Sequence, residues 1–459
     1  MSTPAPRAGW LIPLAVLVLI LDLVALIKRP PWFHGGTVPY RVLAEAPKLP
    51  EVKKRAENRE LVDQLIREMT LEQKIGQLLL VGGWSDYPAK NIAAIHDWHL
   101  GNIAVTSRDA SELAALAEGI SDSQETALAA NNGVPLLVAT TQEGGAFDAL
   151  TSGSLTHLPA AADLGEYAEA LEIERGYSYI GAELKSLGIN TCLAPLMDIG
   201  SVAQSPLVAD KRVWGRSASL VTHDAIAAIA GLQNGGIAAC ARNFPGMGAT
   251  PVDANRVLPV IDYSQKDIEA SDLVPFQSAV RQEVALVMVG HVCYPLIQGQ
   301  RRAPAWTSEL LVQHLLRDQM KYAGVVMTAD LAADSVDQGD ETLVDHGLQA
   351  LKAGCDLLYF TGGADRAAVL AAGLLTATQN GDLSEDVIDT AVARILRLKT
   401  AYKLFDTVKE PPTYLASGVI PELAAHQQGI GQLFENMELR QNPNQERQVK
   451  VGLPGAAAI

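Results

Sequence analysis

Residues 236–255 read GIAACARNFPGMGATPVDAN, and this stretch decides the fold. Residues 236–241 form an apolar run of strand length. The run passes directly into a loop, rich in glycine and proline, that carries Arg242, Asn243 and Asp253. A buried strand that ends in a long polar loop is typical of the functional edge of a parallel α/β barrel. The stretch therefore predicts one barrel strand and the site loop that follows it.

Other apolar runs of strand length recur along the chain, and amphipathic stretches of helical length separate most of them. The eight predicted strands are residues 77–81, 102–105, 135–139, 190–194, 237–241, 285–289, 325–328 and 356–360. The clearest predicted helices are residues 168–186, 217–234, 265–283, 307–322, 343–353 and 384–402. Buried strands that alternate with helices predict a parallel sheet. Eight such strands favour closure into a (β/α)8 barrel of the TIM type, with an open doubly wound sheet as the alternative.

The N-terminal part has a different character. Residues 10–27, WLIPLAVLVLILDLVALI, are almost all apolar and are long enough to span a bilayer as one helix. No A-x-A cleavage site follows, and a basic and proline-rich sequence comes next, so we expect an uncleaved anchor and not a removed signal peptide. The predicted parts are an anchor (1–29), a tether (30–58), the barrel (59–406) and a C-terminal extension (407–459), in which only residues 421–435 have a helical pattern.

Composition and motifs exclude several classes of function. The net charge of −16 argues against a nucleic-acid surface, which requires a basic patch. The nine histidines lack the spacings of metal motifs, so we expect no metal site. The sequence has no dinucleotide or phosphate-binding fingerprint, so we expect no cofactor either. The four cysteines lie in apolar runs and are predicted to be buried free thiols.

Several short motifs appear together and in a fixed order. They are MTLEQKIGQLLLVG at 69–82, QEGG at 142–145, LGIN at 187–190, APLMD at 194–198, FPGMG at 244–248, GHVCYP at 290–295 and AGCD at 353–356. In this order they resemble the N-terminal barrel domain of family 3 glycoside hydrolases, specifically the single-domain bacterial β-N-acetylhexosaminidases. The resemblance covers roughly residues 61–405 and implies the barrel fold.

The resemblance also implies retaining glycoside hydrolysis, which requires a carboxylate nucleophile and a group that protonates the leaving oxygen. The family's nucleophile falls in the turn TADL at 328–331, where this chain has Ala329, followed by Asp330. The family's Asp-x-His acid/base pair falls on Asp253 and Asn255. An amide does not titrate near neutral pH, so Asn255 cannot act as a general acid or base.

The same resemblance implies sugar-binding roles for a set of polar residues at the strand ends: Arg212, Arg242, Asn243, Asp198, His291 and Glu143. Structural roles are the alternative for each of them. On that interpretation Arg212 pairs with Asp198 or Glu143, and Asp198 and His291 form a buried polar pair at the barrel mouth.

The leading hypothesis is a membrane-anchored, catalytically degraded relative of these enzymes, a scaffold or interaction domain whose partners are membrane proteins or an amino-sugar glycan. The alternative is an active β-N-acetylhexosaminidase that hydrolyses N-acetylglucosamine-containing cell-wall fragments, with Asp330 as nucleophile and Asp253 or Glu143 as acid. A third hypothesis keeps the cleft for an anion held by Arg242 and Arg212. We expect a single-pass protein of the cell (inner) membrane whose barrel faces the periplasm or the cell exterior.

Overall fold

The computed structural model describes residues 52–83, 88–105, 113–151, 154–300, 302–336, 340–408 and 410–441. The predicted anchor (1–29) and residues 30–51 of the predicted tether lie outside these ranges. Within them, no helix has both the length and the apolar character needed to cross a membrane.

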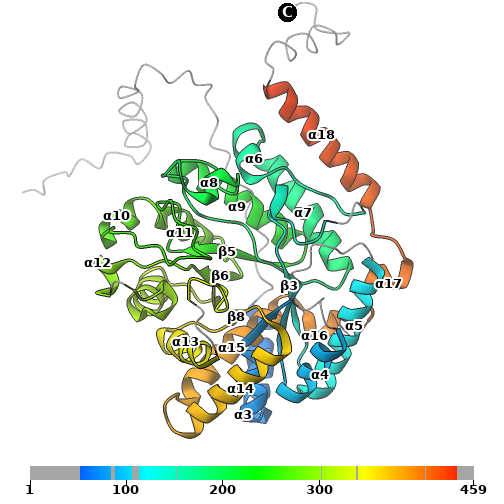
Figure 1. Ribbon diagram of the computed structural model, residues 1–459. Helices are drawn as coiled ribbons and strands as arrows, with labels where there is room; N and C mark the ends of the chain where they lie inside the picture. The colour runs from blue at the N-terminus through cyan, green and yellow to red at the C-terminus, as the bar shows by residue number, and fades with distance from the viewer. Residues whose placement is uncertain are drawn as a thin grey trace, which may run out of the picture. The chain divides into compact units, whose positions relative to one another are not determined.

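Eight parallel strands form the centre of the molecule in the order β7-β6-β5-β4-β3-β2-β1-β8 (Figure 1). Their bounds are β1 Leu79–Gly82, β2 Asn102–Val105, β3 Leu137–Thr140, β4 Thr191–Cys192, β5 Ala238–Phe244, β6 Leu286–Val289, β7 Val325–Thr328 and β8 Leu358–Phe360. All eight overlap the predicted strands. Almost every strand residue is buried, which explains why the strands appear in the sequence as continuous apolar runs.

The sheet closes on itself as a barrel. β1 pairs in parallel with β8, with Leu80 opposite Tyr359 and Val81 opposite Phe360. A parallel bridge between Met327 and Leu357 joins β7 to the start of β8. The prediction of a (β/α)8 barrel is therefore confirmed, and the open doubly wound sheet is excluded.

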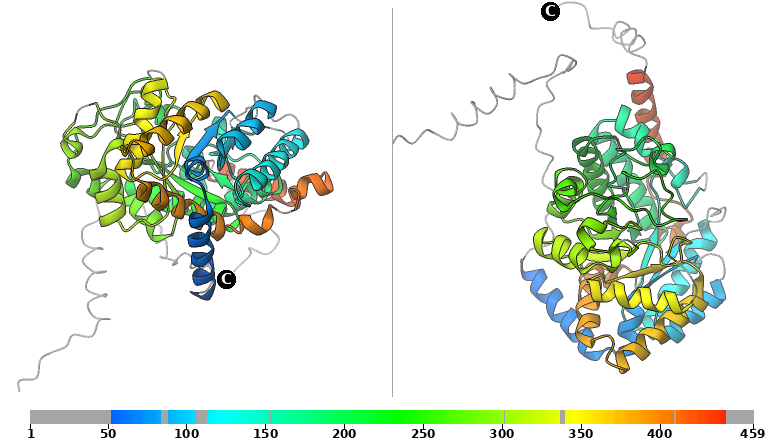
Figure 2. Two further views of the ribbon diagram at one scale, coloured as in Figure 1. Left: turned by 90° about the horizontal axis from the view of Figure 1, so that it is seen from below. Right: turned by 60° about the vertical axis from the view of Figure 1, so that its left-hand side comes forward.

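Helices surround the barrel and cover the outer face of the strands (Figures 1 and 2). The longer ones are α2 Val52–Glu68, α4 Pro88–Trp98, α5 Leu113–Ala130, α7 Ala170–Ser186, α9 Ala218–Asn234, α13 Asp340–Ala353, α14 Gly363–Gln379, α15 Glu385–Ala401 and α18 Leu423–Gln441. The shorter ones are α3 Leu71–Gln77, α6 Ala161–Tyr167, α8 Pro206–Ala209, α10 Gln265–Ala270, α11 Leu273–Arg281, α12 Pro295–Gln298, α16 Leu404–Thr407 and α17 Thr413–Ser417. Short helices η2 Gly145–Phe147, η3 Ala305–Thr307 and η4 Leu310–Gln319 complete the set.

Two predicted helices differ from the structure in detail. Residues 265–283 form α10 and α11 instead of one helix, because Ser271 leaves the helical region with φ −134° and ψ −86°. Residues 310–319 form a π-helix, and at its end the Met320 N–H donates to Leu315 O, five residues back. Hydrophobic periodicity alone resolves neither feature, because buried residues still recur three or four positions apart in both segments.

The described part of the C-terminal extension is more ordered than its sequence suggests. It forms α17 and the 19-residue helix α18, which runs past the predicted end at residue 435. Helix α18 packs against α7 and α6 on the outside of the barrel (Figures 1 and 2). The four cysteines, Cys192, Cys240, Cys293 and Cys355, are buried and free, as predicted.

Helices α7 and α9 cross closely because α9 has a glycine at the contact. A methyl group at Gly231 would collide with Glu174 O of α7 and would lie 2.8 Å from Tyr177 Cβ. Overpacking of this kind costs about 1–3 kcal/mol. We therefore expect Gly231→Ala to lower the free energy of unfolding by about that amount, measured by chemical denaturation of the full chain.

Gly119 in α5 is the matched control, because a methyl group there would meet no atom within 4 Å. Gly119→Ala should raise the free energy of unfolding by roughly 0.5–1 kcal/mol, the usual helical preference of alanine over glycine. Equal effects of the two substitutions would contradict the close crossing.

Candidate functional site

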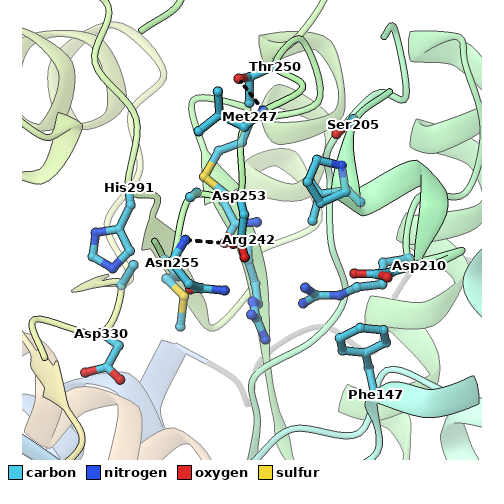
Figure 3. Close-up of a pocket in the computed structure, with 18 of the residues that line it drawn as sticks. Phe147, Ser205, Asp210, Arg242, Met247, Thr250, Asp253, Asn255, His291 and Asp330 are labelled. Atoms are coloured by element: carbon cyan, nitrogen blue, oxygen red, sulfur yellow. Dashed lines mark hydrogen bonds between the residues drawn. The ribbon is translucent and has the colours of Figure 1, made fainter. Parts of the chain in front are cut away.

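A cavity of about 310 Å³ lies at the carboxyl ends of the strands. The segments that follow or end β3 to β8 supply its walls, which is the usual place for a site in this fold. In Figure 3, His291 and Asp330 lie on one side of the cavity, Phe147 and Asp210 on the other, and Arg242 between them. The lining residues are Thr141, Phe147, Leu193, Ser205, Pro206, Leu207, Asp210, Arg212, Arg242, Asn243, Met247, Thr250, Val252, Asp253, Ala254, Asn255, Met288, His291, Ala329, Asp330 and Tyr359.

Glu143 holds the two arginines that line the cavity. Arg212 donates from Nε to Glu143 Oε2 (2.8 Å) and from Nη2 to Oε1 (2.7 Å). Arg242 Nη1 lies 3.0 Å from the same Oε1 and donates to Leu193 O (2.6 Å). The carboxylate is only 5% exposed. A buried charge needs such partners, so Glu143 fixes both guanidinium groups in position.

The turn that carries Glu143 is fixed from two sides. The Tyr177 hydroxyl of α7 donates to Glu143 O (2.8 Å). Phe147, in η2, lies with its ring 4.3 Å from Arg212 Cζ, a cation–π contact. The Arg212 side chain therefore packs between a carboxylate and an aromatic ring, and its position in the wall is well defined.

Asp198 is fully buried and organises the loop after β5. Its Oδ2 accepts from Asn243 Nδ2 (2.9 Å), and its Oδ1 accepts from the Met247 N–H (2.6 Å). Burial raises the pKa of Asp198 to about 6, although these hydrogen bonds oppose the shift. Asp198 therefore determines where the Asn243 and Met247 side chains enter the cavity.

His291 lies at the end of β6, and 3% of it is exposed. The Trp306 indole donates from Nε1 to His291 Nδ1 (3.2 Å). Burial lowers the pKa of His291 to about 4, so the imidazole is neutral at pH 7. Since Nδ1 accepts from the indole, we assign the proton to Nε2, an atom that is buried.

The turn after β7 places Ala329 and Asp330 in the same wall. Asp330 Oδ1 accepts from the N–H groups of Ala332 and Thr361 (2.9 Å each), and its Oδ2 accepts from Thr361 Oγ1 (2.8 Å). Burial raises the pKa of Asp330. Two of these hydrogen bonds tie the carboxylate to Thr361 at the end of β8, and the third closes its own turn at Ala332.

Asp253 and Asn255 lie in the loop after β5. The Asn255 N–H donates to Asp253 Oδ1 (3.0 Å), and Asp253 Oδ2 lies 3.6 Å from Arg256 Nε. The Asp253 side chain is 44% exposed. The backbone contact is a local turn, which supports the structural role of an aspartate at this position.

The structure brings together most of the residues that the sequence selects. Six of them line the cavity directly: Arg212, Arg242, Asn243, Asp253, His291 and Asp330. Glu143 and Asp198 lie beneath them as partners. Of the two partners expected for Arg212, the ion pair is with Glu143. The predicted Asp198–His291 pair is wrong, because Asp198 bonds to the β5 loop and His291 to Trp306.

The residues of the cavity that were missed from the sequence include Phe147, Asp210 and Tyr359. Phe147 is an aromatic residue two positions after the QEGG turn, and Asp210 precedes Arg212 by two residues. Proximity to these motifs is the only local signal that could have found them. Tyr359 lies within β8, where the sequence reads as a core strand.

Among the residues that the structure describes, no group of three His, Cys, Asp or Glu side chains is arranged to hold a metal ion. The side chains that line the cavity offer several kinds of polar group. They provide cationic donors in Arg212 and Arg242, amide groups in Asn243 and Asn255, and carboxylates. This set suits a neutral ligand with several hydroxyl groups.

Comparison with known proteins identifies relatives of the barrel. Residues 70–398 match the pattern described as glycosyl hydrolase family 3 N terminal domain. A β-hexosaminidase of Nitrosomonas eutropha is 31% identical over 51% of this chain and 67% of its own length. A β-N-acetylglucosaminidase/β-glucosidase of Cellulomonas fimi is 28% identical over 74% of this chain and 59% of its own length.

A solved structure has the same fold at similar identity. The family 3 β-N-acetylglucosaminidase of Paenibacillus superposes with a TM-score of 0.73 at 31% identity, over 80% of this chain and 69% of that one. This chain thus spans about 59–69% of the length of these three relatives.

The raised pKa of Asp198 gives a pH dependence that can be measured. A folded-state pKa of about 6, above the ordinary 3.8, contributes stability that is complete below pH 4 and is lost as pH rises through 6. Asp198→Asn lacks this titration. We expect the unfolding free energy of the wild type, minus that of Asp198→Asn, to fall by roughly 2–3 kcal/mol between pH 4 and pH 7.

Chemical denaturation of both proteins across this range provides the measurement. A difference that stays constant, or that grows with rising pH, would show that Asp198 is not a buried carboxyl with a raised pKa.

Proposed function

The chain belongs to the family of the glycosyl hydrolase family 3 N-terminal domain, and on this basis we propose that its cavity binds a glycan containing N-acetylglucosamine. The observation that carries the proposal is the arrangement of Arg212, Arg242 and Asn243 in one wall of the cavity, held from beneath by Glu143 and Asp198. Fixed donors of this kind favour recognition of hydroxyl and acetamido oxygens. The names of the relatives supply the sugar class.

In the proposed function the cavity binds the glycan without rapid turnover. Ala329 occupies the position at which the resemblance expects the nucleophile, and Asn255 occupies the position of the acid/base histidine. Neither side chain can supply a carboxylate or a titrating group. The neighbouring carboxylate, Asp330, accepts two hydrogen bonds from Thr361 at the end of β8 and one from Ala332 in its own turn, which supports a structural role for it.

Hydrolysis is the second candidate function, and the comparisons favour it over a degraded site, because the named relatives are all glycosidases. In this hypothesis Asp330 is the nucleophile. Its carboxylate lines the cavity and retains lone-pair capacity beyond its three bonds. Asp253, which also lines the cavity, is the better candidate for the acid, because both oxygens of Glu143 are engaged by arginines.

We also propose that the barrel is anchored to a membrane. The apolar segment at residues 10–27 is the proposed anchor, and it would hold the glycan-binding cavity near the cell envelope, outside the cytoplasm. Membrane proteins of the same compartment are then the candidate protein partners. This part of the proposal rests on the sequence alone.

Loss of Arg242 tests glycan binding. Arg242→Met keeps the length of the side chain but removes the donors from the cavity wall, while Arg212 still neutralises Glu143. Because a hydrogen bond from a charged donor contributes roughly 1.5–3 kcal/mol, we expect the affinity for N,N′-diacetylchitobiose to fall at least about 10-fold, measured by calorimetry.

Arg256→Met is the matched control, since Arg256 is 81% exposed on the loop that follows β5, and it should bind as the wild type does. Absence of chitobiose binding by the wild type, or equal affinity in the two variants, would count against an amino-sugar site at this cavity.

Hydrolysis is tested with a fluorogenic N-acetylglucosaminide and three proteins. We expect no measurable turnover by the wild type or by Asp330→Asn. The double variant Ala329→Asp, Asn255→His should gain turnover, because it restores both groups that the resemblance requires.

Turnover by the wild type that disappears in Asp330→Asn would establish the second candidate, an enzyme with a relocated nucleophile. No turnover by any of the three proteins would mean that the cavity no longer positions the sugar for reaction.

A further inference from the structure

Helix α18 docks on the barrel through a stripe of buried residues: His426, Ile430, Leu433 and Met437. Their spacing of three or four residues places them on one face of the helix. At its C-terminal end Arg440 donates to Glu172 Oε2 (2.7 Å) and to Tyr167 O (2.6 Å). The face of α18 is therefore matched to α7 along much of its length.

One member of the stripe is polar, and it forms a buried ion pair or hydrogen bond. His426 Nδ1 lies 2.9 Å from Glu183 Oε1, and its ring stacks on Tyr179 with centroids 4.5 Å apart. His426 is 4% exposed and Glu183 is 1% exposed. Burial of both groups is unfavourable unless their hydrogen bonds are complete, so this contact specifies how α18 docks.

Glu183 makes a second contact, on its other side, with the segment between β3 and α6. Its Oε2 accepts from the Thr156 N–H (2.8 Å), and its Oε1 accepts from the Thr156 hydroxyl. The same carboxylate thus holds α18 and Thr156 at once. Removal of the His426 contact would take one partner from the buried Glu183 and leave its bonds to Thr156 in place.

An apolar contact runs beside this polar one. A methyl group placed at Gly176 of α7 would lie 2.8 Å from Leu158 Cδ2 and 3.5 Å from Ile430 Cδ1. Leu158 and Ile430 therefore reach the same point on α7. One comes from the segment between β3 and α6, and the other from α18.

Hydrogen bonds within that segment connect Thr156 and Leu158 to the cavity wall. The Gly145 N–H donates to Leu158 O (2.9 Å). Asp148 Oδ1 accepts from the Gly144 N–H (2.7 Å), and Asp148 Oδ2 lies 3.2 Å from His157 Nδ1. Gly144 and Gly145 adjoin Glu143, so these bonds reach the residue that holds both arginines.

We propose that α18 is a clamp for the cavity, in which His426 and Glu183 act as positioning residues for the segment that carries Glu143 and Phe147. The importance of the clamp for ligand binding rests on the proposed function of the cavity. The effect of the clamp on the position of the segment does not depend on that function, because the contacts exist without any ligand. The C-terminal extension is therefore a part of the site, although it lies outside the barrel.

Hydrogen exchange of the full chain tests the clamp without a ligand. In His426→Ala we expect the amides of Gly144, Leu150 and Thr156 to exchange roughly 10-fold faster, the effect of losing one buried hydrogen-bonding partner. Amides of β5 and β6 should exchange as in the wild type. His426→Gln, which keeps a donor for Glu183, should restore most of the protection.

Gln428→Ala is the matched control, because Gln428 is exposed on the same helix. Thr156→Val provides a second route, since it removes the hydroxyl from Glu183 and leaves every α18 residue in place. It should also speed exchange at Gly144 and Leu150. Unchanged exchange in the segment, or faster exchange spread evenly through the barrel, would overturn the clamp.

Calorimetry with N,N′-diacetylchitobiose then separates the two proposals. If the cavity binds the sugar, His426→Ala should weaken binding roughly 10-fold and His426→Gln should recover it. Failure of the wild type to bind would overturn the proposed function, while the exchange result would still decide the clamp. Full affinity in His426→Ala would overturn the role of the clamp in binding.

Discussion

The buried Glu143 carboxylate is the constraint on which the cavity depends. It neutralises Arg212, from the segment after β4, and Arg242, from β5, while its own backbone belongs to the segment after β3. One carboxylate thus ties together three neighbouring strand ends. Without it, two guanidinium groups of like charge would face each other at low exposure, which is strongly unfavourable. Glu143, Arg212 and Arg242 therefore form one electrostatic unit, and a substitution at any of them affects the other two.

The barrel could be predicted from the sequence because its strands are buried on both faces, so eight apolar runs alternate visibly with amphipathic helices. The contacts that position the cavity walls could not be predicted from the sequence. Glu143 and Arg242 are 99 positions apart in the numbering, and no local pattern connects them. The same holds for His426 and Glu183, separated by 243 positions, so the sequence predicted a helix in the C-terminal extension but not the surface on which it packs. Periodicity reports which face of an element is buried, but not which element covers it.

Fold and chemistry are separate questions in this protein. The motifs that survive, such as QEGG and FPGMG, supply backbone turns and buried partners that hold the barrel mouth together. Ala329 and Asn255, at the positions where the resemblance expects the nucleophile and the histidine, line the cavity. The turns and buried partners can hold the barrel mouth together whether or not the cavity carries out a reaction. A likeness that extends over most of the chain is for this reason a weak guide to turnover.

The pairing of β1 with β8 has a consequence for biosynthesis. Leu79 of the first strand meets Leu358 of the last, 279 positions later, so the barrel cannot close until residue 358 has left the ribosome. Until then β1 presents an unpaired edge of apolar residues, the kind of surface that other chains can extend. Long-range pairing of this type also slows folding. We expect the nascent chain to depend on protection of this edge during synthesis.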